Sequence, residues 1–148
     1  MRRSGAALAL VLAVGILLTG CAGPDPVLVR DEAQAVFDQL VARTAESDTA
    51  VVRVVETAEP AEQACDGDDE RTQTGLTATA TLSITATAAD TRRIRDDLAD
   101  TLDPETWTTI HPAGAEQVAR ISEHDVVVTL TARGPALVIA VFTPCTAP

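Results

Sequence analysis

The chain has 148 residues and carries 22 Asp and Glu against 11 basic residues, all arginine, so its formal net charge is −11 at pH 7. This acidity excludes binding to nucleic acid through a basic face, since phosphates require cations, and it excludes docking of the protein surface onto anionic lipid. Aromatic residues make up only 2% of the chain, too few for a platform that stacks sugars or bases, and the length excludes a two-lobed solute receptor.

The first residues predict export from the cytoplasm. Arg2 and Arg3 precede an apolar run from Ala6 to Leu18 that has no polar side chain. Its thirteen residues are fewer than the ~20 that a membrane-spanning helix needs. A charged start, a short apolar stretch and a small-residue exit are typical of a secretory signal. We therefore expect residues 1–20 to be a signal peptide.

The exit from this run, LTGC, resembles the lipobox of bacterial lipoproteins, in which an aliphatic residue and two small residues precede a cysteine. The resemblance implies cleavage between Gly20 and Cys21 and a diacylglyceryl group on the Cys21 thiol, because a thiolate is the nucleophile that accepts the lipid. Two or more acyl chains, palmitate among them, would hold the protein stably at the outer face of the cell membrane. The alternative is an ordinary signal peptide that ends near a cysteine.

Removal of the signal would leave 128 residues, with 9 arginines against 22 acids and a net charge of −13. This length suits a lipidated tether (residues 21–25) and a single domain (residues 26–148) with a sizeable core. The two cysteines that remain, Cys65 and Cys145, are expected to form a disulfide in an exported protein. A metal pair or a reactive thiol is the alternative, but neither cysteine has a second Cys or a His at zinc-binding spacing.

The first predicted elements of the domain are a helix and a strand. Asp25 is suited to cap a helix and Pro26 to occupy its first turn, and apolar residues then recur at helical spacing up to Glu46. The pattern predicts a helix over Pro26–Glu46. The β-branched stretch Val51–Val55 predicts a strand, and the polar stretch up to Gly75 predicts a loop.

The clearest pattern is Leu76–Ala88, where apolar residues alternate with Thr or Ser without a break. Period-two alternation predicts one long strand with an apolar face and a hydroxyl face. The alanines make the apolar face shallow, which suits a helix packed close to the sheet. We regard the hydroxyl face as a possible binding face, the alternatives being a plain solvent-facing side or sites for O-linked sugar. The hydroxyl face consists of Thr77, Thr79, Thr81, Ser83, Thr85 and Thr87.

The remainder predicts a second helix, capped by Asp90 and ended by Pro104, and then four strands. The strands are expected at Thr106–Ile110, Glu116–Ile121, Asp125–Thr131 and Ala136–Phe142. The last is apolar on both faces, which indicates an interior strand or one covered by a partner. Short connections favour a mostly antiparallel sheet with two helices on one face, an α+β two-layer sandwich in the order α-β-β-α-β-β-β-β.

This order of elements resembles the small LppA-type lipoproteins of high-G+C Gram-positive bacteria. They also have a lipobox, a helix, a strand, a cysteine in a loop, a strand, a helix, and a meander that ends near a second cysteine. The likeness covers most of the domain. It implies the anchor at Cys21 and a Cys65–Cys145 bridge, and it carries no activity.

Candidates for catalysis and metal binding are few. Ser122 and His124 share a tight turn, His111 ends a strand, and no G-x-S-x-G elbow occurs. The acidic run Asp66–Glu70 has its glycine at the second position, whereas an EF-hand loop needs it at the sixth. We therefore predict no catalytic residue and no metal site, with weak calcium contact as the alternative to a solvated acidic loop.

The sequence thus predicts a membrane-anchored extracytoplasmic lipoprotein that is not an enzyme and binds an envelope protein or a ligand, with no cofactor besides the acyl anchor. The alternative is a small hydrolase or metal-dependent enzyme that uses His111, His124 and acidic loop residues. A pocket in which a histidine faces a carboxylate would favour the enzyme. A closed core with an exposed apolar patch would favour the binding protein.

Overall fold

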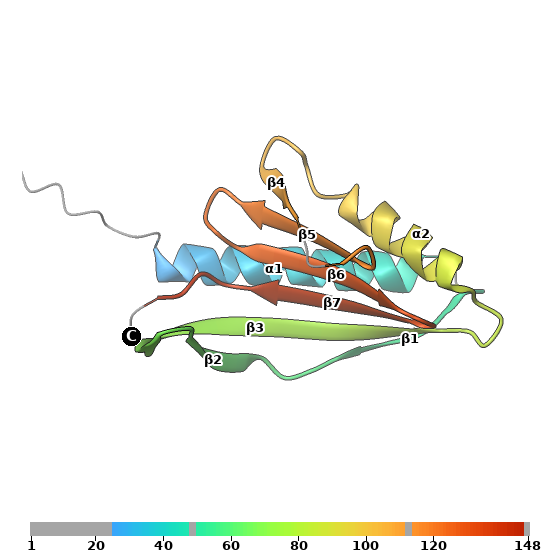
Figure 1. Cartoon of the computed structure of the whole chain (residues 1–148), viewed down its shortest axis with the longest axis horizontal. Coiled ribbons are helices and arrows are strands. Elements are labelled where there is room, and N and C mark those ends of the chain that lie inside the picture. The colour runs from blue at the N-terminus through green and yellow to red at the C-terminus, as the bar shows by residue number, and fades with distance from the viewer. Residues whose placement is uncertain (1–24, 48–49, 112–113, 147–148) are drawn as a thin grey trace, which may run out of the picture.

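The computed structural model describes residues 25–47, 50–111 and 114–146, without the side chains of residues 68 and 69. The predicted signal peptide, the Gly20–Cys21 cleavage site and the Cys21 anchor lie outside the described residues. The elements form an α+β fold, as predicted (Figure 1). They are α1 (Pro26–Glu46), β1 (Val52–Thr57), β2 (Ala61–Cys65), β3 (Asp68–Leu82), α2 (Ala88–Ala99), β4 (Trp107–Ile110), β5 (Gln117–Ser122), β6 (Val127–Arg133) and β7 (Ala136–Phe142).

Helix α1 has the predicted bounds, because its start and its buried stripe are both local features of the sequence. The Asp25 side chain accepts a hydrogen bond from the Val27 backbone N–H at 2.9 Å, and Pro26 occupies the first turn. The stripe that α1 buries consists of Val29, Ala33, Val36, Phe37, Leu40 and Thr44. Within the described ranges, no helix is both long and apolar enough to cross a membrane.

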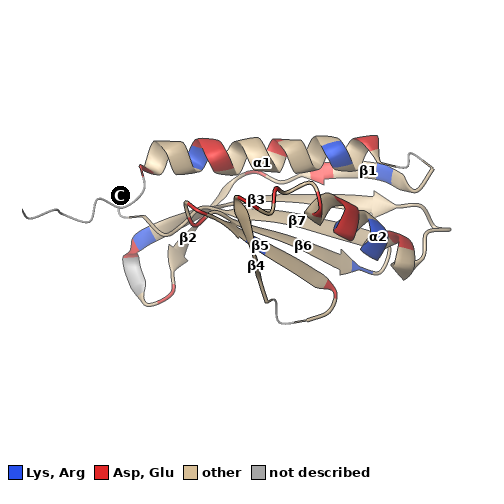
Figure 2. Ribbon diagram, turned by 90° about the horizontal axis from the view of Figure 1, so that it is seen from above, with Lys and Arg blue, Asp and Glu red and all other residues tan. Residues whose placement is uncertain are grey.

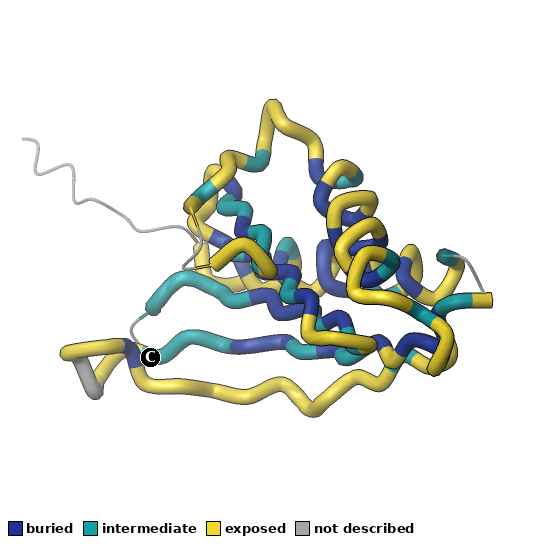
Figure 3. Tube along the Cα trace, turned by 45° about the vertical axis from the view of Figure 1, so that its right-hand side comes forward, coloured by how far each residue is buried: buried dark blue, intermediate teal, exposed yellow. Residues whose placement is uncertain are grey.

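The strands form one antiparallel sheet in the order β1-β3-β7-β6-β5-β4, with β2 paired to β3 as well. Residues 78–81 of β3 pair with both β1 and β7, and Gly75 pairs with Ala61 of β2 and with Phe142 of β7, so β1 and β2 both lie on the side of β3 away from β7. Strand β7 is interior, which confirms the prediction from its two apolar faces. The edge formed by β1 and β2 is largely exposed (Figure 3).

The predicted loop before Gly75 is wrong, because this stretch forms a hairpin of β2 and the first half of β3. Ala61 pairs with Gly75 and Ala64 with Thr72, and Gly67 turns the chain with a φ of +79°. Most of β2 is exposed. Backbone pairing forms this hairpin without a buried face, so hydrophobic alternation does not reveal it.

Strand β3 ends at Leu82, six residues before the predicted end, although the alternation of Thr and Ala continues. The chain turns there and α2 begins with Thr87 as its cap, not Asp90 as predicted. The Thr87 side chain accepts a hydrogen bond from the Asp90 N–H, and the Asp90 carboxylate accepts one from the Thr87 N–H at 2.8 Å. This reciprocal capping box satisfies two N–H groups at the helix start.

Both helices pack on one face of the sheet, as predicted. Helix α1 contacts β1, β3 and β7, and α2 contacts β5, β6 and β7. Ala78 and Ala80 of β3 are buried beneath the helices, so their small side chains let α1 approach closely. The core lies between these two layers, and the opposite face of the sheet carries no helix among the described residues (Figures 1 and 2).

Candidate functional site

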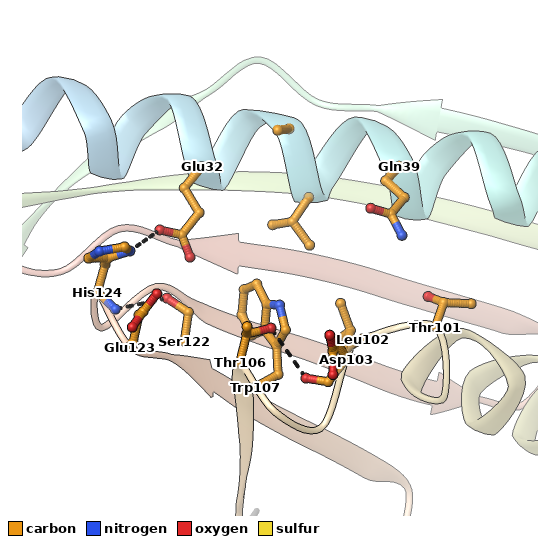
Figure 4. Close-up of a pocket in the computed structure, with 12 residues that line it drawn as sticks. Glu32, Gln39, Thr101, Leu102, Asp103, Thr106, Trp107, Ser122, Glu123 and His124 are labelled. Atoms are coloured by element: carbon orange, nitrogen blue, oxygen red, sulfur yellow. Dashed lines mark hydrogen bonds and ion pairs between the residues drawn. The ribbon is translucent and has the colours of Figure 1, made fainter.

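A pocket of about 390 Å³ lies between α1, the loop from α2 to β4, and the turn from β5 to β6 (Figure 4). Helix α1 contributes Glu32 and Gln39, which both point toward the other two segments. The loop contributes Asp103 and the adjoining Trp107, so the pocket combines apolar and polar side chains from parts of the chain that are far apart. Its volume is within the range of small-molecule sites.

His124 and Glu32 bridge one end of the pocket. The Nδ1 atom of His124 lies 2.7 Å from Oε2 of Glu32, and the Glu32 side chain is 27% exposed. The turn that carries His124 is fixed by Asp125, whose φ of +63° is a left-handed conformation that Asp tolerates, and by the Ser122 side chain. This is the histidine–carboxylate arrangement that the sequence analysis associated with an enzyme.

Ser122 lines the same pocket, but its hydroxyl oxygen has a structural role. It accepts hydrogen bonds from the backbone N–H groups of His124 at 3.2 Å and Val126 at 3.3 Å, and Ser122 is only 7% exposed. No hydrogen bond joins this hydroxyl to the His124 ring in the described part of the chain. A serine nucleophile requires that bond to its base. The Ser122 hydroxyl instead stabilises the β5–β6 turn.

Trp107 is positioned by the loop before it. The Asp103 carbonyl accepts the Trp107 N–H at 2.8 Å, and the Asp103 carboxylate accepts the Glu105 N–H at 2.9 Å. These bonds tighten the chain after α2 and direct the partly buried indole toward α1 (Figure 4). The loop thereby holds an aromatic ring and a carboxylate at the same pocket.

The other residues of the predicted enzyme alternative do not join His124. His111 follows β4 at the end opposite Trp107, whereas the pocket lies at the Trp107 end of that strand. Asp66 belongs to a separate hollow beside the disulfide. No cluster of three or more His, Cys, Asp or Glu suited to a metal ion occurs among the described residues.

The predicted hydroxyl face is only partly a sheet face. Thr77, Thr79 and Thr81 lie on the side of β3 away from the helices, because the register alternates them with buried Ala78 and Ala80. The other three residues were wrongly assigned to the strand. Ser83 is buried in the turn with its Oγ 3.0 Å from Oγ1 of Thr85, and Thr87 caps α2.

The uncovered side of the sheet extends beyond β3, and we call it the open face. Within described residues 75–82, 117–121, 127–133 and 136–142, Arg133 at the end of β6 is the one charged residue that the register places on it. On the neighbouring edge strand β1, Glu56 pairs with Thr79 and lies on the same face. Most other charged residues lie on the helices, the loops, strand β1 and the β2–β3 hairpin (Figure 2). The central part of the open face consists of Thr77, Thr79, Thr81, Val138, Ala140, Phe142, Val127, Thr129 and Thr131.

The predicted Cys65–Cys145 disulfide is confirmed, with 6.1 Å between the two Cα atoms. It joins the end of β2 to the segment that follows β7. The same segment is tied to β3 by two backbone hydrogen bonds of 3.0 Å between Thr72 and Thr146. The bridge and the backbone bonds together fasten the C-terminal end of the domain to the β2–β3 hairpin.

The pocket was not predicted from the sequence, nor were its residues Glu32, Asp103, Trp107 and Glu123. Glu32 is 92 positions from His124, so no local pattern connects them. Trp107 did carry a signal, since it is the single tryptophan of a chain with 2% aromatic residues. Pro104, which was predicted to end the second helix, lies in the loop, because α2 already ends at Ala99. In comparisons with known proteins, the chain matches no protein-family model, no curated protein and no solved structure.

Proposed function

We propose that this chain is a membrane-anchored extracytoplasmic lipoprotein whose domain binds an envelope protein without catalysing a reaction. The observation that carries the proposal is the open face. Although the chain has a net charge of −11, the central part of this face consists of Thr, Val, Ala and Phe side chains, and the charged residues Glu56 and Arg133 lie at its margins. Uncharged faces of this kind lose water at modest cost, and each threonine offers a partner both a methyl group and a hydroxyl group.

The start of α1 supports the anchored arrangement. Val27 and Leu28 are 61% and 63% exposed on its first turn. Pro26 follows Cys21 by five positions, a distance that an extended chain covers in at most about 18 Å. A lipid on Cys21 would therefore hold these two apolar side chains near the membrane surface. The LTGC resemblance to a lipobox is the basis for the lipid itself.

The anchor is tested by Cys21→Ser. We expect the serine variant to lack the acyl mass and to leave washed membranes, while the unchanged protein stays. Retention of the variant at the level of the unchanged protein would refute the anchor.

The binding face is tested by changing Thr79, Thr129 and Thr131 together to Glu. Three carboxylates would require desolvation on binding, so capture of the partner from the envelope by crosslinking should fail. The control is a single Thr85→Glu change, which adds one carboxylate off the open face. Equal capture by the triple variant and the control, with both folded by circular dichroism, would contradict a role for this face.

The second candidate function is a small hydrolase, and the His124–Glu32 pair favours it. A carboxylate that orients a histidine is a recurring part of a general-base site. We expect His124→Gln to leave cellular function unchanged. We expect the same result for the double variant that combines His111→Gln with His124→Gln. A folded His124→Gln protein that behaves as a null would make the hydrolase the better assignment.

A further inference from the structure

The pocket beneath α1 has an electrostatic character that restricts what it can bind. Three segments each contribute one carboxylate to its lining: Glu32 from α1, Asp103 from the α2–β4 loop and Glu123 from the β5–β6 turn. Among the described residues, no arginine lines it, and His124 is the one lining residue that can carry a positive charge. An anion would therefore meet repulsion from three sides.

Several oxygen atoms of these three carboxylates accept no hydrogen bond from the described residues. Glu32 uses Oε2 for His124, and Asp103 uses Oδ1 for the Glu105 N–H. The hydrogen bonds of the described residues leave Oε1 of Glu32 and Oδ2 of Asp103 without a donor, and they include none to Glu123. A bound cation could take these oxygens without breaking any contact that holds the domain together.

Trp107 gives the pocket an aromatic surface between these carboxylates. Its indole stands in the groove below α1, close to Thr106 and Leu102 (Figure 4). Among the aromatic side chains, tryptophan attracts cations to its face most strongly, and the attraction grows when water is displaced. Apolar lining from Ala35, Val36 and Leu102 suits the carbon substituents of such a cation.

Other ligand classes fit this lining less well. A bare metal ion needs several converging donors, and the described residues contain no such group. A sugar is usually held by several aromatic rings, whereas Trp107 is the one aromatic residue among the described residues that line this pocket. We propose that the pocket is a binding site for a small organic ammonium ion, whose charge lies against the Trp107 ring and the carboxylates of Glu32, Asp103 and Glu123. This site is separate from the open face, so either can fail without the other.

The single tryptophan makes the test direct. The chain has one Trp and no Tyr, so its intrinsic fluorescence reports on the pocket alone. We would titrate the full domain with choline and, in parallel, with its neutral carbon isostere, in which a tert-butyl group replaces trimethylammonium. Choline should change the fluorescence saturably with a Kd of about 1 mM or tighter, and the isostere should bind at least about tenfold more weakly.

Matched charge variants separate the site from the general acidity of the chain. Glu32→Gln, Asp103→Asn and Glu123→Gln, combined, should weaken choline binding by about tenfold or more. The control removes as many charges at the opposite edge of the sheet by combining Glu56→Gln, Glu59→Gln and Asp66→Asn, and it should bind as the unchanged protein does. Circular dichroism would show that both triple variants are folded.

Four results would contradict the proposal. Absence of a saturable response to choline would show that the pocket does not take this class of ligand. Equal affinity for choline and the neutral isostere would show a merely apolar site. Equal weakening in the two triple variants would show attraction by net charge only. A folded Trp107→Leu variant that keeps full affinity by calorimetry would remove the role given to the ring.

Discussion

Loss of the Cys65–Cys145 bridge should cost this domain a large part of its stability. The two residues are 80 positions apart, so the bridge closes a loop that spans most of the described chain. In the chain-entropy treatment, such a loop restricts the unfolded state by about 15 cal/mol/K, which is about 4.5 kcal/mol at 25 °C. A domain of this size has a total unfolding free energy of about 6–18 kcal/mol.

The same free energy predicts a shift in melting temperature. With an unfolding entropy of about 2.1 cal/mol/K per residue over residues 26–148, loss of about 4.5 kcal/mol lowers the midpoint by about 17 °C. We would follow thermal unfolding of the domain by circular dichroism in three forms: oxidised, reduced, and with both cysteines changed to alanine. Since Cys65 is only 8% exposed, the alanine form also loses packing and should melt at or below the reduced form.

A decrease of less than about 5 °C in the reduced form would refute the reasoning, because the loop entropy would then not be the main contribution. Hydrogen exchange adds a local readout. The backbone N–H groups of Thr72 and Thr146, which bond each other's carbonyls, should exchange faster after reduction. Unchanged protection of these two groups would show that backbone pairing holds the segment without the bridge.

Three further predictions concern the core, a helix cap and one ion pair. Leu130→Ala, at a side chain only 1% exposed, should lower the unfolding free energy by about 3 kcal/mol in urea titration, and a loss below about 1 kcal/mol would contradict the packing. Thr87→Ala removes the α2 cap and should cost about 1 kcal/mol by the same assay, whereas no change would contradict the capping box. The Arg92 hydrogen bond lowers the pKa of Glu116, so its stabilisation is present above the unfolded-state pKa and lost as the pH falls through the folded-state pKa. Melting midpoints of Glu116→Gln and the unchanged protein should therefore differ at neutral pH and converge in acid, and a constant difference would contradict this pair.

Local chemistry made several elements predictable from the sequence. Helix α1 follows from a capping Asp25, a first-turn proline and an apolar stripe, all within one stretch of chain. Strands β5, β6 and β7 follow from apolar runs between short turns, within two residues at each end. The disulfide was predicted by counting: with Cys21 assigned to the expected lipid anchor, Cys65 and Cys145 were the two cysteines that remained.

The β2–β3 hairpin and the end of β3 depended on tertiary structure. The hairpin has little buried surface, and it forms because backbone groups pair with the sheet and the disulfide holds its tip. The alternation of apolar residues with Thr and Ser continues to Ala88, and on that basis alone the strand was predicted to extend past Leu82. The chain instead turns at Ser83, which is buried, and Thr87 and Asp90 begin α2 there, so competing local interactions ended the strand.

The pocket was decided entirely by the tertiary structure. In the sequence, Glu32 is indistinguishable from the other acidic residues on the exposed side of a helix, and His124 is a polar residue in a turn. They meet because α1 crosses the sheet above the β5–β6 turn, which brings side chains 92 positions apart to 2.7 Å. Sequence periodicity specifies which face of an element is buried, but it does not specify which distant loop lies against that element.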